Sequence, residues 1–292
     1  MIIDCHQHTD WHGKTTADFI QYFDSAGVDR AWLLSWEEID GGRDPGYMHL
    51  SIDNVFATAA AHPSRYVIGT APDPRRENVL ELIRRYRREG AKIFGEVKLC
   101  VLMDTPELIA AFRLAGELGM PVLFHLQLPN PKDPDVRRDR GPGQWYLGDI
   151  DAVERTLTQC PGTVFLGHGP GWWAHISADE KGYGVPKPDA AGLGGPYASV
   201  YPDGPVVPGG GVVRLLEKYP NIYCDLSAWS GLNGISRDRE FGRRFLIDYA
   251  DRLLYGTDYW DTKLLDYLRG LELPPAVLEK ILSGNAIRLE PK

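Results

Sequence analysis

The stretch that decides the fold is Met1-Ile2-Ile3-Asp4-Cys5-His6-Gln7-His8, an apolar start that runs into a His-x-His. Successive side chains of a β-strand point to opposite faces, so His6 and His8 point the same way. Two imidazoles at one strand end form half of a metal site, because neutral imidazole is the commonest protein ligand for zinc and similar ions. By itself the pair fits an N-terminal strand with two surface histidines equally well, so the rest of the chain decides.

Beyond this stretch, short apolar segments alternate with helical segments along all 292 residues. Return connections of helix length require parallel strand pairing, and near-continuous apolar strands fit a sheet covered on both faces. The pattern predicts an α/β protein with a single (β/α)8 barrel over residues 1–292. A doubly wound open sheet is the alternative, disfavoured because polar residues end nearly every strand. The expected strands are residues 1–8, 30–35, 66–70, 91–99, 121–125, 163–168, 221–227 and 252–258.

One connection is unusually long. The stretch from Gly169 to Gly211 exceeds an ordinary link between elements. Because it contains two tryptophans and three tyrosines, we expect an ordered lid inserted after the sixth strand, over about residues 169–211.

Composition narrows the class of protein. The formal charge of −8 argues against partners such as nucleic acid or an anionic membrane, which favour a basic face. The four cysteines are scattered without a Cys-x-x-Cys spacing, which suits buried free thiols in a reducing compartment. The start has no charged segment followed by an apolar one, and no apolar run approaches a membrane span. We therefore expect a soluble, cytoplasmic protein that acts on a small molecule.

Polar residues gather at the carboxyl ends of the expected strands, where a barrel converges its loops. Four histidines and an aspartate on four strands are hard to explain by packing, since each would be desolvated without a structural return. The residues are His6 and His8 on the first strand, Glu96 and Lys98 on the fourth, His125 on the fifth, His168 on the sixth and Asp258 on the eighth.

At these positions the chain resembles the amidohydrolase superfamily, and most closely its amidohydrolase-2 branch. That branch contains metal-dependent hydrolases and decarboxylases of the aminocarboxymuconate-semialdehyde type. The resemblance covers nearly the whole chain and implies a distorted (β/α)8 barrel with one or two divalent metal ions, usually zinc. It is carried by His6-Gln7-His8, Leu123-Phe124-His125, Leu166-Gly167-His168-Gly169, Tyr255-Gly256-Thr257-Asp258 and Gly284-Asn285-Ala286.

The resemblance also implies roles. His6, His8 and His125 would be metal ligands, and Asp258 would be a ligand that also takes a proton from the activated water. His168 would orient or polarise the substrate, and in a two-metal version it is a ligand as well.

The fourth strand is where the site is open to two interpretations. Many two-metal members carry a carboxylated lysine or a glutamate there, and here Glu96 and Lys98 share one strand face. We expect Glu96 to be a ligand and Lys98 to contact the substrate. The alternative is a Glu96–Lys98 pair that only packs the rim and leaves a one-metal site.

Further substrate contacts are expected outside the strands. His12 follows the metal pair, and Trp172 and His175 lie in the expected lid. A loop histidine such as His12 is, however, more often simply solvated. Because relatives of this general type are often dimers, a homodimer is expected as well.

A divalent cation lowers the pKa of bound water, so the site predicts hydrolysis of a C–N, ester or lactone bond of a small molecule. The alternative reaction is nonoxidative decarboxylation of an aromatic or unsaturated carboxylic acid. A non-catalytic barrel that binds metal or ligand is the alternative from another class. Asp258 argues against it, because a pure binding site has no need of a proton acceptor.

Overall fold

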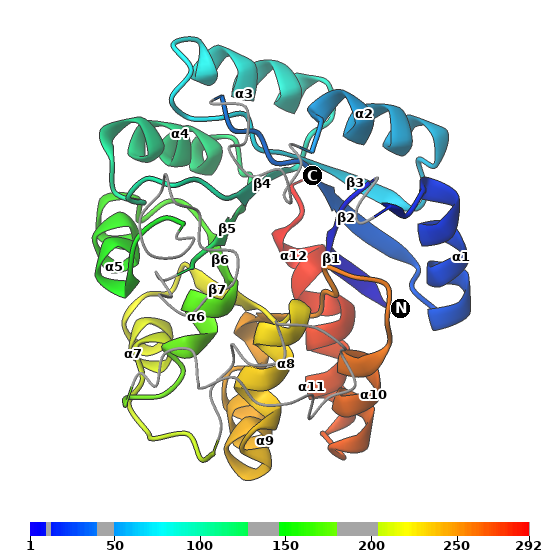
Figure 1. Cartoon of the computed structure of the whole chain (residues 1–292), viewed down its shortest axis with the longest axis vertical. Coiled ribbons are helices and arrows are strands. Elements are labelled where there is room, and N and C mark those ends of the chain that lie inside the picture. The colour runs from blue at the N-terminus through cyan, green and yellow to red at the C-terminus, as the bar shows by residue number, and fades with distance from the viewer. Residues whose placement is uncertain (10–12, 40–49, 128–145, 180–203, 292) are drawn as a thin grey trace.

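The computed structural model describes residues 1–9, 13–39, 50–127, 146–179 and 204–291. Eight parallel strands follow one another around a sheet in chain order (Figure 1). They are β1 (Ile3–Gln7), β2 (Arg30–Leu34), β3 (Tyr66–Thr70), β4 (Ile93–Val97), β5 (Val122–His125), β6 (Phe165–His168), β7 (Ile222–Asp225) and β8 (Leu253–Leu254).

The ring closes between its last and first strands. The Cys5 N–H donates to the Tyr255 carbonyl at 2.9 Å, and the Asp258 N–H donates to the His6 carbonyl at 2.8 Å. These bonds extend the seam beyond the two residues of β8. The predicted single (β/α)8 barrel is therefore confirmed.

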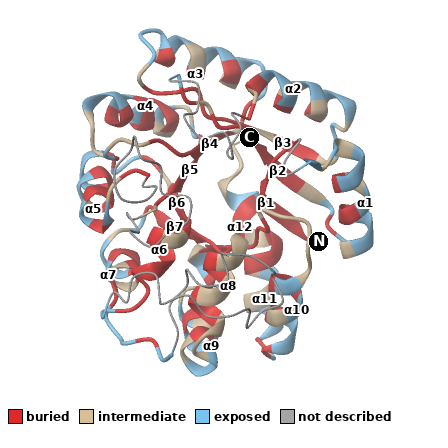
Figure 2. Ribbon diagram, in the orientation of Figure 1, coloured by how far each residue is buried: buried red, intermediate tan, exposed pale blue. Residues whose placement is uncertain are grey.

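Helices surround the barrel, with their buried faces turned inward (Figures 1 and 2). The first helix shows why they begin and end where they do: Thr15 and Asp18 form a capping box, and Gly27 ends the helix at φ 74°. The helices are α1 (Thr16–Ala26), α2 (Ile52–Ala61), α3 (Val79–Arg88), α4 (Pro106–Glu117), α5 (Ile150–Gln159), α6 (Pro170–Ala174), α7 (Gly211–Lys218), α8 (Ala228–Ser236), α9 (Arg239–Asp248), α10 (Lys263–Gly270), α11 (Pro275–Glu279) and α12 (Asn285–Leu289).

Two of these helices were not predicted. The expected lid begins with α6, a buried helix, whereas residues 180–203 lie outside the described residues. Helix α8 follows β7 directly, although its sequence contains two glycines and an asparagine. The lid therefore stays a prediction.

Among the described residues no helix is long and apolar enough to cross a bilayer.

Apolar side chains fill the barrel as well as the layer between strands and helices. Inside, residues such as Trp32, Leu123 and Leu166 form a separate cluster, against which Ala286 and Leu289 of α12 pack. Asn285 anchors this helix, because its Nδ2 donates to the carbonyls of Ala250 and Leu253 at 2.7 Å each. Helix α12 therefore lies at the amino ends of the strands, and the polar residues lie at the opposite, carboxyl ends.

Candidate metal centre

Two irregularities in the sheet turn the polar residues of β1 and β4 into the barrel. Between Asp4 and Gln7, β1 carries one residue more than β2, and β4 does the same against β5 between Phe94 and Val97. An extra residue of this kind switches the alternation of faces. In β1 the interior face therefore passes from Ile3 and Cys5 to His6 and His8. In β4 it passes from Ile93 to Glu96, which brings the Glu96 carboxylate next to the imidazoles of His6 and His8.

The β1 histidines point their Nε2 atoms at each other. His8 Nδ1 lies 3.0 Å from the Leu34 carbonyl, an obligate acceptor, and His6 Nδ1 lies 2.7 Å from the Asp225 carboxylate. Each imidazole therefore donates through Nδ1, and in its neutral form it keeps a lone pair on Nε2. The two Nε2 atoms are only 3.1 Å apart. Two lone pairs at this distance repel unless a proton or a metal cation lies between them.

Two carboxylates complete this cluster. Asp258 Oδ1 lies 3.5 Å from His6 Nε2 and 3.3 Å from His8 Nε2, and Glu96 Oε2 lies 3.8 Å and 3.5 Å from the same atoms. Ligands about 2.0–2.1 Å from a tetrahedral zinc are about 3.3 Å from one another. Each carboxylate oxygen therefore lies near the spacing of a fellow ligand from both imidazole nitrogens, and His6, His8 and Glu96 form one candidate metal-binding group while His6, His168 and Asp258 form another.

A second cluster shares Glu96. Its other oxygen, Oε1, lies 2.7 Å from His125 Nδ1 and 4.0 Å from His168 Nε2, and these three residues form a further candidate metal-binding group. Glu96 thus faces each cluster with one oxygen, which is how a carboxylate bridges two ions. The arrangement can hold one ion or two.

Asp225 and Ser227, at the end of β7, organise the imidazoles from behind. Asp225 Oδ2 accepts from His6 Nδ1 and from the Ser227 hydroxyl at 2.8 Å, and it lies 3.2 Å from His168 Nδ1. Ser227 Oγ lies 2.9 Å from the same His168 nitrogen. These contacts direct Nε2 of both imidazoles into the centre, as carboxylate–histidine–metal arrangements require.

A third layer holds the Asp258 backbone. Asp4, buried beneath His6, accepts from the Thr257 N–H at 2.9 Å, from its hydroxyl at 2.5 Å and from Gln7 Nε2 at 2.9 Å. Asp258, the residue after Thr257, has φ 52°, a left-handed conformation that is strained for aspartate. Sequence reasoning missed Asp4, Gln7 and Thr257, although all three lie within two residues of a predicted ligand.

Burial and neighbouring charges shift the pKa values of the groups at the centre. Burial lowers the pKa of His6, but Asp258 and Asp225 outweigh burial and raise it well above its ordinary value. Burial would raise the pKa of Glu96, yet Lys98 and the His125 imidazole hold it well below the usual range. For His125, burial and Lys98 lower the pKa to about 4, so this imidazole is neutral at pH 7 and can act as a ligand.

The donor set fits a divalent cation on one further observation. Asp258 Oδ1 is buried and accepts no hydrogen bond from a described residue. A buried carboxylate oxygen without a hydrogen-bond partner is costly, and a cation between it and the two imidazole Nε2 atoms removes that cost.

The predicted substrate contacts lie in different environments. Lys98 is buried beside the centre, with Nζ 4.3 Å from the Trp36 ring centroid and 5.1 Å from that of Tyr146. Trp172 is fully enclosed and packs edge-on against Phe124. His175 is buried where α6 ends, and its carbonyl accepts from the first turn of α7. His12 lies outside the described residues.

Comparison with known proteins gives a family match over part of the chain. Residues 209–289 match the family model described as amidohydrolase, of the amidohydrolase-2 type. That segment contains Asp225, Ser227, Asp258 and Asn285. No curated protein matches the chain at a significant level.

Solved structures share the fold over the whole chain. An uncharacterised TIM-barrel protein from Bordetella bronchiseptica has a TM-score of 0.64 and 16% identity, covering 99% of this chain and 97% of that one. A probable 2-pyrone-4,6-dicarboxylic acid hydrolase from Acinetobacter baumannii gives 0.60 and 11%, with 99% and 98% covered. A dihydroxybenzoic acid decarboxylase from Polaromonas, with bound manganese, gives 0.59 and 15%, with 99% and 96% covered. The family model confirms the resemblance to the amidohydrolase-2 family over residues 209–289, and the solved structures confirm the barrel fold over the whole chain.

Proposed function

We propose that this protein is a metal-dependent hydrolase that directs water at a C–N, ester or lactone bond of a small molecule. The observation that carries the proposal is the position of Asp258. Its Oδ1 has no hydrogen-bond partner and lies beside the Nε2 atoms of His6 and His8, and its Oδ2 lies 3.6 Å from His168 Nε2. One carboxylate thus reaches both a candidate metal ligand set and a candidate polarising imidazole.

His6, His8, Glu96 and Asp258 would hold a divalent ion, and His125 and His168 would join Glu96 in holding a second. A divalent cation is supported by this donor set and by the manganese bound to the Polaromonas relative; zinc itself stays a proposal. Such an ion supplies Lewis acidity, which lowers the pKa of water from about 16 to about 7.

Three side chains of the centre carry out proton transfer, carbonyl polarisation and substrate orientation. Asp258 accepts the proton of the attacking water and returns it to the leaving group, because its second oxygen lies 3.6 Å from His168 Nε2, beside the imidazole that would polarise the substrate. His168, held through Nδ1 by Ser227 and Asp225, directs Nε2 at the substrate carbonyl or the developing oxyanion. Lys98, buried next to Glu96, supplies the positive charge that would orient an anionic or carbonyl group of the substrate.

Decarboxylation of an aromatic acid is the second candidate. It is favoured by the buried ammonium of Lys98 beside the centre, which suits a substrate carboxylate, and by the decarboxylase among the structures that share the fold. The homodimer and the cytoplasmic location remain predictions.

Asp258→Asn tests the assignment. Asparagine keeps an oxygen that can contact the ion but cannot accept the proton, so we expect metal content to persist by elemental analysis. Turnover should fall about 10²–10⁴-fold. Asp248→Asn, an exposed aspartate at the end of α9, is the matched control. Metal-loaded protein is screened against lactones, amides, esters and aromatic acids. Undiminished turnover in Asp258→Asn contradicts the mechanism, and release of carbon dioxide instead of hydrolysis products replaces the proposal with the decarboxylase.

A further inference from the structure

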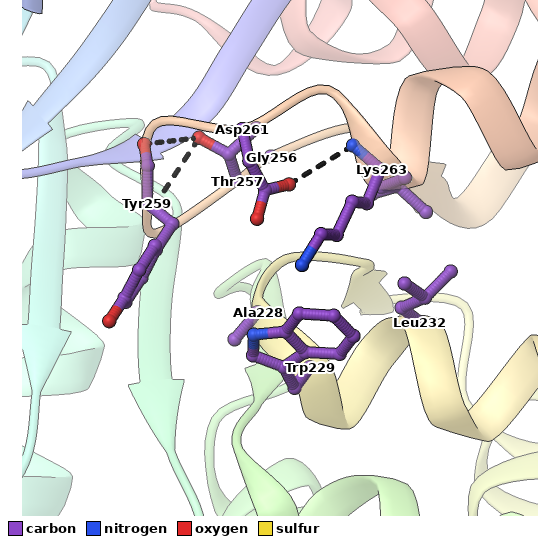
Figure 3. Close-up of a pocket in the computed structure, with 9 residues that line it drawn as sticks. Ala228, Trp229, Leu232, Gly256, Thr257, Tyr259, Asp261 and Lys263 are labelled. Atoms are coloured by element: carbon purple, nitrogen blue, oxygen red, sulfur yellow. Dashed lines mark hydrogen bonds between the residues drawn. The ribbon is translucent and has the colours of Figure 1, made fainter. Parts of the chain in front are cut away.

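A groove adjoins the metal centre between α8 and the loop that leads from β8 to α10 (Figure 3). It shares its floor with the centre. Ala228 follows Ser227, which contacts His6 and His168, and the Ala228 N–H donates to the carbonyl of Thr257, the residue before Asp258, at 3.0 Å. Its other walls include Trp229, Leu232, Tyr259, Lys263 and Asp261, whose carboxylate accepts from the Lys263 backbone N–H at 3.0 Å.

The floor is strained on both sides. Ala228 has φ 60° and Asp258 has φ 52°, and neither is a glycine. Non-glycine residues in this left-handed region are uncommon and cluster at active sites and ligand clamps. The Ala228–Thr257 hydrogen bond joins Ala228 to the residue before Asp258, so the backbone of the groove is continuous with the backbone that carries the Asp258 carboxylate.

One cation lies across the groove. The Lys263 ammonium sits 4.1 Å from the centroid of the Trp229 ring, and Figure 3 shows its side chain extended over the indole. Among the described residues no carboxylate lies within 4.0 Å of this ammonium. With Lys263 in place the groove keeps about 20 Å³ of free volume, room for about one water molecule.

Lys263 can leave this position, because its side chain is exposed. When it does, the Trp229 ring and Leu232 offer a flat apolar surface, and the ammonium stays at the rim on its long stem. A ligand that fits both features has a planar ring to lie on the indole and an anionic group to pair with the ammonium.

We propose that this groove is a substrate subsite that takes the ring and carboxylate of an aromatic acid while the reacting bond lies at the metal centre. The proposal rests on the proposed function, whose substrate class it names. Lys263 and Trp229 act as specificity-determining residues, and their loss should weaken binding without altering the chemistry at Asp258.

The test is direct binding of 4-fluorobenzoate to the metal-loaded full chain, followed by ¹⁹F NMR. We expect at least about a fivefold weaker Kd in Lys263→Met and in Trp229→Leu, and a Kd close to the original in Trp229→Phe, which keeps a ring. 4-Fluorobenzamide, the neutral isostere, should bind the unaltered protein at least about fivefold more weakly than the acid.

Lys14→Met is the matched control, because Lys14 also lies over a tryptophan, 5.4 Å from the Trp260 ring, in a different groove. Thermal unfolding confirms that each variant is folded. Equal Kd values for the original protein and Lys263→Met overturn the proposal, since a carboxylate bound only to the metal ion does not depend on Lys263. Because binding is measured without turnover, absence of hydrolysis defeats only the proposed function.

Discussion

At the scale of single residues, the centre depends on which nitrogen of each imidazole carries a proton. The Leu34 carbonyl settles this for His8 and the Asp225 carboxylate for His6. The sequence indicates the histidines, because they end expected strands. It does not indicate their partners, which come from β2 and β7 and meet them only when the barrel closes.

Asp225→Asn should weaken metal binding about 10–100-fold. The amide cannot match the carboxylate as an acceptor for His6 Nδ1 and the Ser227 hydroxyl, so the imidazoles lose their fixed orientation. Competition titration against a chelator measures the affinity. Asp29→Asn, which removes a carboxylate bound to the Ile2 N–H at the other end of β1, should leave the affinity unchanged. An unaltered affinity in Asp225→Asn would show that this residue does not orient the ligands.

At the scale of elements, the alternation of apolar and helical segments predicts where the strands lie. It does not predict the extra residues in β1 and β4. Regular alternation from Ile3 and Cys5 would turn His6 out of the barrel, and the extra residue in β1 turns it in. Helix α8 was missed for a related reason. Gly231 and Gly234 weaken helix propensity, yet a Cβ at Gly231 would lie 2.1 Å from the Leu226 carbonyl oxygen and one at Gly234 2.7 Å from the Trp173 ring. Packing, not propensity, therefore selects these residues.

The seam between β8 and β1 gives a prediction at this scale. Thr257→Val removes the hydroxyl that donates to Asp4, leaving a buried carboxylate with one bond fewer, and should lower the free energy of unfolding by about 1–3 kcal/mol. It should also weaken metal binding, because Asp258 follows directly. Thr257→Ser keeps the hydroxyl and should restore both quantities. Chemical denaturation measures the free energy of unfolding, and chelator titration measures the metal affinity. If Thr257→Val and Thr257→Ser have the same stability and the same metal affinity, the hydroxyl does not have this role.

The contact between α5 and α7 has its own pH dependence. Arg214 and Lys218 lower the pKa of Glu154 from 4.5 to about 2. A lowered folded pKa means that the stabilisation is present above pH 4.5 and is lost as the pH falls towards 2. Because Arg214 and Lys218 are 44% and 58% exposed, solvent screens the contribution to about 1 kcal/mol or less.

Glu154→Gln should therefore be slightly less stable than the original protein at pH 7, and the difference should shrink below pH 4. Urea denaturation at both pH values measures it. A difference that grows on acidification would mean that Glu154 is not held as a carboxylate by these two cations.

At the scale of the whole molecule, the barrel itself was predictable, since strand-length and helix-length segments alternate along the chain. The hydrogen bonds that close it were not, because β8 has only two residues and the seam is completed by bonds at Cys5 and Asp258. The family motif of Asn285 also has a physical role here: it fixes α12 beneath the barrel. Helix α12 fills the barrel at the amino ends of the strands, and the candidate metal ligands lie at the carboxyl ends.

The most direct test of the account is anomalous diffraction from crystals of the metal-loaded protein, measured on both sides of the absorption edge of the metal. The account predicts a peak about 2.0–2.2 Å from His6 Nε2, His8 Nε2 and an oxygen of Asp258. A two-ion centre adds a peak among Glu96, His125 and His168. A fully loaded crystal with no peak between His6, His8 and Asp258 would contradict it.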